Sequence, residues 1–135
     1  MNQAINFSSL GIKTTPARLM VLELLIQKGI PADVETILSY LHKKDLHVNP
    51  VTIYRILDLF VEKGIAHRFE FNEGKFRYEI AKKDHHHLVC QECGAIEDIS
   101  DCGVEDLEKK IARKKQFIVK RHALEFFGLC QNCQE

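Results

Sequence analysis

Two cysteine pairs constrain this chain more than any other feature: Cys90-Gln-Glu-Cys93 and Cys130-Gln-Asn-Cys133. A C-x-x-C turn presents two thiolates on one tight knuckle, so two such turns offer the four sulfur ligands of a closed tetrahedral zinc site. Structural zinc contributes about 10–16 kcal/mol in small zinc peptides, as much as the roughly 5–15 kcal/mol net stability of a whole domain. The spacing therefore predicts a four-cysteine zinc site on which the segment after Ala81 depends.

The alternative is that the four cysteines form two disulfides, which oxidising compartments favour. The sequence has an odd count of five cysteines, and its start lacks the basic head and apolar core of a secretory signal. Both features favour a reducing, cytoplasmic protein whose thiolates remain available to metal. The fifth cysteine, Cys102, is interpreted as a bystander thiol. No stretch approaches the roughly 20 apolar residues of a membrane span, so no membrane partner is expected.

The first half of the chain has the pattern of three short helices followed by a hairpin. The pairs Thr15-Pro16 and Asn49-Pro50 are typical of a helix N-cap followed by the first helical residue, and a further helix is expected after Pro31. Residues 65–71 and 76–80 alternate apolar and polar side chains around a polar turn at 72–75, as two paired strands do. This order predicts a winged helix-turn-helix.

The third predicted helix, residues 50–63, is the candidate for reading DNA, because such proteins lay the second helix of the motif in the major groove. Thr52, Tyr54 and Arg55 lie opposite its apolar stripe, and Arg pairs bidentately with guanine while Tyr contacts a thymine methyl or a phosphate. The alternative is a solvated polar face with Tyr54 half-buried. A second polar group is expected where the first helix meets the DNA backbone: Lys13, Thr14, Thr15 and Arg18.

The whole chain has a net charge of zero, but its two halves differ in sign. Residues 1–83 carry 12 Lys/Arg and 9 Asp/Glu, whereas residues 84–135 carry 7 and 10. The predicted hairpin contributes Arg68, Lys75 and Arg77, basic groups placed to lie along a phosphate strand. This distribution favours a polyanion partner for the first half and cation binding for the second.

The rest of the chain mixes strand and helix patterns. Residues 95–99, 117–119 and 124–127 are predicted strands, and Val104, Leu107 and Ile111 form one face of a predicted helix. A short polar segment, residues 81–84, is a predicted hinge. The expected fold class is α+β, with a winged-helix DNA-binding domain over residues 1–80, the hinge at 81–84 and a small α/β metal-binding domain over 85–135.

A histidine cluster, Asp84-His85-His86-His87, stands directly before the first cysteine pair. Side chains alternate along an extended segment, so His85 and His87 share one face and can bind one ion, while His86 points to the opposite face.

Three motifs together resemble the ferric-uptake-regulator (Fur) family from about Leu10 to Cys133. They are Asn49-Pro-Val-Thr-Ile-Tyr-Arg-Ile-Leu, His85-His-His-Leu-Val-Cys-Gln-Glu-Cys-Gly and Gly128-Leu-Cys-Gln-Asn-Cys. The resemblance implies a homodimeric, metal-activated transcriptional repressor that binds double-stranded operator DNA and dimerises through its C-terminal lobe. Residues 94–108 and the terminal motif look most like the zinc-uptake regulator (Zur) branch.

The resemblance also implies up to three metal sites, the first being the structural zinc site at Cys90, Cys93, Cys130 and Cys133. The implied sensing site draws on both sides of the hinge: His67, Glu79, His85, His87 and Asp98. The implied third site comprises Asp84, His86, Glu105 and His122. For His122, a structural strand histidine is the alternative.

The residues point in different directions on the sensed metal. Many iron-sensing relatives have a histidine just before the second helix of the reading motif, where Lys28-Gly29-Ile30 has none. Zinc sensors often have a cysteine at the position of Ala81. His67 is zinc-like and Glu79 is iron-like, and Glu79 with Asp98 also fits an iron-based peroxide sensor. The expected function is repression of zinc-uptake genes with regulatory Zn²⁺; the alternatives are Fe²⁺ in an iron-responsive or peroxide-sensing member.

Two other classes are weaker alternatives. A zinc enzyme would use His85, His87, Glu79 and a water, but the sequence has neither an H-E-x-x-H nor an H-x-E with P-C-x-x-C motif. A cytosolic metal buffer explains the ligands but not the reading helix. We therefore expect no enzymatic activity and no small-molecule substrate.

Overall fold

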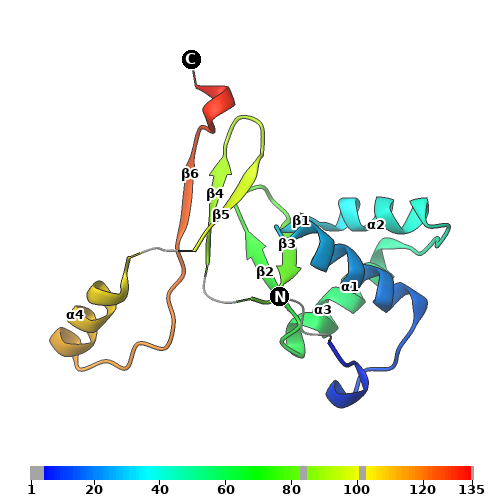
Figure 1. The fold of residues 1–135 in the computed structure, drawn as a ribbon, viewed down its shortest axis with the longest axis horizontal. Coiled ribbons are helices and arrows are strands. Elements are labelled where there is room, and N and C mark those ends of the chain that lie inside the picture. Colours follow the sequence, from blue (N-terminus) through cyan, green and yellow to red (C-terminus); the bar gives the residue numbers. More distant parts are fainter. Residues whose placement is uncertain (1–4, 83–84, 101–102, 135) are drawn as a thin grey trace. The chain divides into compact units, whose positions relative to one another are not determined.

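The computed structural model describes residues 5–82, 85–100 and 103–134, which form two compact units, residues 1–81 and 82–135. The N-terminal unit contains η1 (Ser8–Leu10), α1 (Pro16–Lys28), β1 (Ala32–Asp33), α2 (Val34–Lys43), α3 (Pro50–Glu62), β2 (Ala66–Glu70) and β3 (Phe76–Ile80) (Figure 1). The C-terminal unit contains β4 (His86–Cys90), β5 (Ile96–Ile99), α4 (Glu105–Lys115), β6 (Glu125–Gly128) and η2 (Gln131–Cys133). Among the described residues, no helix has both the length and the apolar character required to cross a membrane.

The helices of the N-terminal unit begin at side-chain caps. The Thr15 hydroxyl accepts a hydrogen bond from the backbone N–H of Arg18 at 3.2 Å, and Asn49 Oδ1 accepts one from Thr52 at 3.0 Å. Each cap satisfies a backbone N–H that has no partner within the helix, and the proline that follows needs none. The helix starts predicted at residues 16 and 50 are confirmed.

A single apolar core holds the N-terminal unit together. The three helices pack on one another and on the sheet, and the Phe7 and Phe60 rings lie 5.7 Å apart between centroids. The side chains with no exposed surface include Val21, Leu25, Ile37, Leu41, Ile53, Leu57 and Phe60. Because the buried face of α3 is filled by this core, its polar face is left at the surface.

The wing is the hairpin of β2 and β3, which pair antiparallel from Ala66↔Ile80 to Glu70↔Phe76. Its turn uses Asn72 and Gly74 with φ of 62° and 78°, a left-handed conformation that these two residue types tolerate. With three helices before it, the wing completes the predicted winged helix. The sheet also contains β1, which pairs with β3 through Ala32↔Tyr78. This two-residue strand was not predicted, because it is too short to show an alternating pattern.

The C-terminal unit is a three-stranded sheet in the order β5-β4-β6, with α4 in the connection between β5 and β6. β4 lies in the middle, antiparallel to β5 and parallel to β6. The strand predicted at 117–119 was wrong, because these residues have no strand assignment and the Phe117 and Ile118 side chains are 62% and 79% exposed. The apolar side chains of this segment are therefore not buried within the C-terminal unit. The predicted α+β fold class is confirmed.

One ion pair joins the wing to the helix-turn-helix within the N-terminal unit. Lys75 Nζ lies 2.6 Å from Asp33 Oδ2, and Asp33 Oδ1 accepts the N-cap hydrogen bond from Thr36 at 2.8 Å. Burial alone would raise the pKa of Asp33, but the hydrogen bonds from Lys75 and Thr36 outweigh it and hold the pKa well below its ordinary value.

We predict that Asp33→Asn, which keeps a capping oxygen but loses the charge, lowers the free energy of unfolding by about 1 kcal/mol at pH 7. A carboxyl with a lowered folded-state pKa stabilises the fold above its unfolded pKa, and this contribution is lost as pH falls through the folded pKa. The difference between the two proteins should therefore shrink below about pH 4. Urea unfolding at several pH values measures it. A difference that grows on acidification would contradict the assignment.

Candidate metal centres and DNA-binding surface

The pairing of β4 with β6 brings the two cysteine pairs together. Cys90 stands opposite Gly128 in the parallel register, and the N–H of Gln91 donates to the Gly128 carbonyl at 2.8 Å. Cys130 follows two residues later, so the second knuckle begins where the first one does. Residues separated by about forty positions in sequence are thereby placed at one end of the sheet.

Each knuckle is closed by its own backbone. The Gly94 N–H donates to the Cys90 carbonyl at 2.9 Å, with Gly94 at φ 78°, a left-handed conformation suited to glycine. The Cys133 N–H donates to the Cys130 carbonyl at 3.0 Å. The Cys130 N–H donates to Cys90 Sγ at 3.3 Å, an interaction that favours a thiolate at Cys90. The knuckles are therefore formed by the chain itself.

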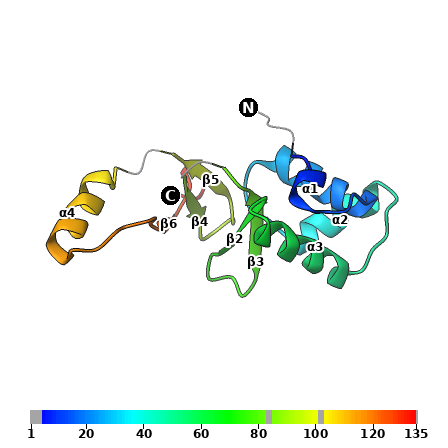
Figure 2. The same ribbon diagram turned by 90° about the horizontal axis from the view of Figure 1, so that it is seen from below.

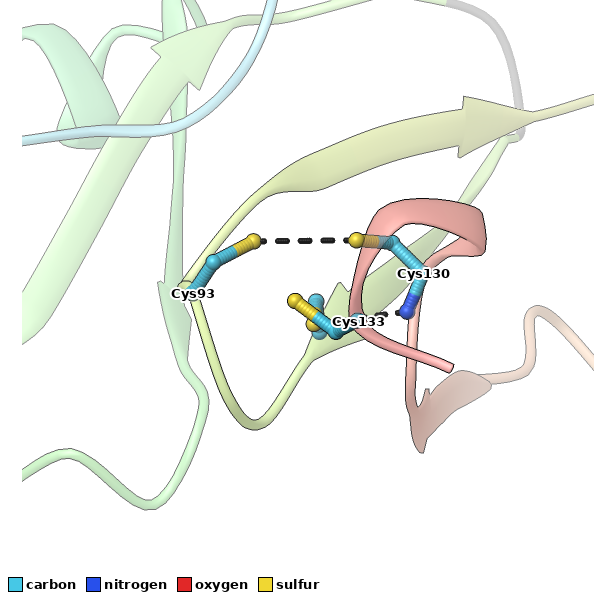
Figure 3. A group of neighbouring side chains, drawn as sticks. Cys93, Cys130 and Cys133 are labelled. Atoms are coloured by element: carbon cyan, nitrogen blue, oxygen red, sulfur yellow. Dashed lines mark hydrogen bonds between the residues drawn. The ribbon is translucent and has the colours of Figure 1, made fainter. Parts of the chain in front are cut away.

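The four sulfurs have the spacing of a tetrahedral site. Their Sγ atoms all lie within 4.8 Å of one another, and Cys93 Sγ is 3.7 Å from Cys130 Sγ (Figure 3). Zinc–sulfur bonds of about 2.3 Å give a tetrahedron with edges of about 3.8 Å, whereas a disulfide needs about 2.05 Å. These four cysteines are free thiols. The donor set and its spacing fit zinc; Cys102 lies outside the described residues.

The cluster also has the electrostatics of a cation site. Backbone hydrogen bonds from Cys93 and Cys130 lower the pKa of Cys90 to about 6. Hydrogen bonding with Cys130 and Cys90 raises the pKa of Cys133 to about 12, because a second thiolate would be forced against its neighbours. Four thiolates at this spacing thus require a cation between them, and binding one releases protons.

We predict that Cys133→Ser loses zinc and unfolds the C-terminal unit, because three thiolates and a water hold zinc far less well than four thiolates. Cys102→Ser, at the one cysteine that belongs to neither C-x-x-C pair, is the matched control and should keep the wild-type zinc content. Zinc analysis and sedimentation of both variants make the measurement. A Cys133→Ser protein with full zinc content and the wild-type sedimentation coefficient would remove the basis for a structural site.

A second group of possible ligands lies within the C-terminal unit at the start of β4. The rings of His85 and His87 are 4.9 Å apart between centroids, and His87 stands opposite Asp98 in the β4–β5 register. His87 Nε2 is 3.8 Å from Asp98 Oδ1, and Lys82 Nζ is 2.6 Å from Asp98 Oδ2. Two imidazoles and a carboxylate are donors that both zinc and Fe²⁺ accept.

The two other residues of the implied sensing set belong to the N-terminal unit. His67 in β2 stands directly opposite Glu79 in β3. Their side chains leave the same face of the hairpin, so they can act together. Their membership in the sensing site remains a prediction.

On the opposite face of β4, the structure forms a chain of three side chains. His86 Nε2 lies 2.8 Å from His122 Nε2, and His122 Nδ1 lies 2.8 Å from Glu108 Oε2. His86 is buried and His122 is partly buried. Glu108, which sequence reasoning missed, stands one helical turn after the predicted Glu105, a spacing that places both on one face of α4. Asp84 lies outside the described residues, and Glu105 stays a prediction.

The predicted DNA-reading residues occupy the exposed face of α3. Tyr54 is 45% exposed, Arg55 is exposed, and Thr52 is partly exposed. This exposure fits both the DNA-reading face and the alternative of a solvated face with Tyr54 half-buried, so their DNA contacts stay a prediction. Before α1, Lys13 and Thr14 are exposed, while Thr15 serves as the helix cap and Arg18 Nη1 donates to the Lys13 carbonyl at 2.7 Å. This hydrogen bond from Arg18 therefore fixes the backbone at Lys13.

A winged helix followed by a sheet with clustered cysteines and histidines is the architecture expected of a metal-responsive, DNA-binding transcription regulator. Residues 9–127 match the Ferric uptake regulator family, and the chain belongs to that family. Its members are metal-responsive transcription regulators, not enzymes. The resemblance drawn from the motifs is thereby confirmed at the level of the family.

Similar proteins carry several regulator names. The chain is 31% identical over 137 residues to the ferric uptake regulation protein of Bordetella parapertussis, covering 100% of this chain and 99% of that one. It is 30% identical over 125 residues to the peroxide operon regulator of Bacillus subtilis, covering 93% and 86%.

Among solved structures, the Vibrio cholerae ferric uptake regulator matches with a TM-score of 0.81 at 32% identity, covering 92% of this chain and 96% of that one. The Helicobacter pylori ferric uptake regulator, described as having three functional metal-binding sites, matches with a TM-score of 0.83 at 28% identity, covering 96% and 87%. These names do not single out the zinc-uptake branch.

Proposed function

We propose that this protein is a homodimeric, metal-activated repressor of metal-uptake genes that binds operator DNA through α3, with zinc as the sensed ion. One observation carries the proposal: the chain has a winged helix with its own apolar core and, in addition, two separate clusters of possible metal ligands. One cluster consists of four cysteines and the other includes His85, His87 and Asp98. One cluster has the donors of a permanent site, and the other has the weaker donors of a reversible one.

The choice of zinc rests on the number of donors. No histidine stands at Lys28-Gly29-Ile30 to add a further ligand. The proposed set of His67, Glu79, His85, His87 and Asp98 supplies at least the four donors that zinc prefers, and His67 is its zinc-like member. Iron is the second candidate, because two histidines and one carboxylate also form the ligand set of non-haem Fe²⁺ sites. The ferric and peroxide names of the relatives favour that candidate.

The third site is proposed at His86 and His122. Two imidazole nitrogens 2.8 Å apart lie closer than two ligands of one ion would, so a metal would have to separate them slightly. Glu108 joins His122 from the far ring nitrogen and holds the tautomer that leaves Nε2 facing His86. In this proposal Glu108 orients the ligand, and Asp84 and Glu105 complete the set.

Homodimerisation is proposed through the exposed apolar face of the C-terminal unit. α4 has no buried residue among those described, and Leu107 and Ile111 on its apolar side are 52% and 41% exposed. The exposed apolar set continues beyond α4: Phe117, Ile118, Phe126, Phe127 and Leu129. This many exposed apolar side chains in one small unit favours an interface, and two half-sites in an operator need two reading helices.

We predict that Ile118→Asp, at the most exposed of these side chains, shifts the protein from dimer to monomer. A charge buried in an apolar interface is left without a partner and weakens association by two or more orders of magnitude. Lys109→Asp, on the side of α4 opposite Leu107 and Ile111, is the matched control and should remain dimeric. Sedimentation across protein concentrations reports both. A dimeric Ile118→Asp protein would place the interface elsewhere.

The proposed coupling between metal and DNA follows from where the ligands lie in the sequence. His67 and Glu79 precede the predicted hinge at 81–84, and His85, His87 and Asp98 follow it. An ion held by both groups restricts the motion of the hinge. A larger fraction of dimers then holds its two reading helices at the separation of two operator half-sites. Reciprocity then requires operator DNA to tighten metal binding by the same factor.

We predict that DNA binding by the wild-type dimer requires added metal, with zinc more effective than Fe²⁺ or Mn²⁺. His87→Ala should keep the four-cysteine zinc and the dimer mass but lose metal-dependent DNA binding. Arg55→Ala should keep metal coupling and relax sequence preference by roughly 1–3 kcal/mol.

Two titrations test this prediction: DNA affinity against each metal, and metal affinity with and without operator. Stronger activation by Fe²⁺ would replace zinc by iron as the sensed ion. Equal coupling in wild type and His87→Ala would move the sensor to His86 and His122.

A further inference from the structure

The wing carries three cationic side chains, and the structure divides them into two kinds. Arg68 is in β2, Lys75 is in the turn and Arg77 is in β3. All three have the charge to bind a phosphate strand. Their partners within the N-terminal unit decide which of them is available to DNA.

Lys75 is engaged with a buried carboxylate. Its Nζ lies 2.6 Å from Asp33 Oδ2, and Asp33 is only 9% exposed while it also caps α2 through Thr36. If Lys75 moved to a phosphate, it would leave a desolvated carboxylate without its counter-ion. Lys75 therefore positions the wing against the start of α2.

Arg77 is engaged through one edge of its guanidinium, the edge that carries Nε and Nη2. Its Nε donates to Glu73 Oε1 at 2.8 Å and its Nη2 donates to Glu73 Oε2 at 2.9 Å, a bidentate pair across the turn. The Arg77 side chain is 16% exposed. Its donors are directed at Glu73, so Arg77 closes the turn.

Arg68 has a different environment. Its guanidinium carbon lies 4.5 Å from the centroid of the Phe76 ring, the geometry of a cation–π contact, and the residue is exposed. No carboxylate in the described part of the chain forms an ion pair with Arg68. The Arg68 side chain also forms a hydrogen bond with Tyr78, a neutral partner. The aromatic ring and this hydrogen bond fix the side chain without neutralising its charge.

Arg68 also stands beside the reading helix. β2 packs on α3. Tyr78 is paired with Arg68 in the hairpin. Burial raises the pKa of Tyr78 and the Asp58 carboxylate raises it further; the charge of Arg68 and its hydrogen bond lower it, and Tyr54 adds to the rise. The Tyr78 side chain thus lies among Arg68 and the exposed residues Tyr54 and Asp58 of α3. Figure 2 shows the hairpin of β2 and β3 alongside α3 in this unit.

We propose that Arg68 is the DNA-phosphate contact of the wing, held in place by Phe76, and that Lys75 and Arg77 make no such contact. The inference rests on the proposed DNA-binding function and assigns one further binding residue to it. A guanidinium held over a ring loses little side-chain freedom when it meets a phosphate, and its position extends the contact made by α3 along the backbone of the same site.

The test is the salt dependence of DNA binding by the metal-loaded, full-length protein. The probe is a duplex selected by the wild type from random-sequence DNA. Each phosphate contact contributes about 0.9 to the slope of log K against log salt concentration, so Arg68→Gln should give a slope shallower by about 0.9 and about fivefold weaker binding at 0.15 M salt. Arg68→Lys, which keeps the charge, should keep the slope.

Lys75→Gln is the matched control, because it removes one charge from the same hairpin. Its slope should equal that of the wild type, and it should instead lower the urea midpoint. A wild-type slope for Arg68→Gln, or an equal decrease for Lys75→Gln, would overturn the assignment. A wild type that binds no duplex with any metal would overturn the proposed function itself, which separates the two failures.

Discussion

The parallel pairing of β4 with β6 is the interaction on which the C-terminal unit depends. It sets Cys90 opposite Gly128 and so places both cysteine knuckles at one end of the sheet. The buried apolar side chains among the described residues of this unit are Val89, Cys90 and Ile96, a core too small to offset the entropy of ordering such a segment. Small units of this kind need a metal or a partner chain, and this one has ligands for the first and an exposed apolar face for the second.

The N-terminal unit is built on the opposite principle. Its helices and sheet enclose a continuous apolar core, so its stability does not require a metal ligand. Its charged and polar residues are then available for two different tasks. Lys75 and Arg77 neutralise carboxylates within the unit, whereas Tyr54 and Arg55 remain on the surface of α3. A small net positive charge is sufficient for a DNA-binding unit when the cations that face DNA are few and fixed in position.

Local signals in the sequence were sufficient to predict much of this fold. Contacts between residues far apart in the sequence could not be predicted from it. The caps at Thr15 and Asn49 and the two cysteine knuckles are fixed by neighbouring residues, so their patterns could be interpreted directly. The strand predicted at 117–119 failed because a short apolar run such as Phe117-Ile118-Val119 looks the same in the sequence whether it pairs in a sheet or lies at the surface. The contact of Glu108 with His122 joins α4 to a segment 14 residues away, and the spacing of apolar and polar residues in the sequence does not predict such a contact.

Charge explains how one protein can hold one ion permanently and release another. Four thiolates around a divalent cation leave a net negative cluster, and every ligand that dissociates exposes a thiolate to close neighbours, which opposes release. Two neutral imidazoles with one or two carboxylates leave a site near neutrality, and each ligand regains good hydration when the ion departs. The same metal can therefore be structural at the four cysteines and exchangeable at His85, His87 and Asp98. The exchangeable ligands adjoin the predicted hinge in the sequence, whereas the cysteines lie at the far end of β4. In the proposed function, it is therefore the exchangeable ion, and not the structural one, that couples to DNA binding.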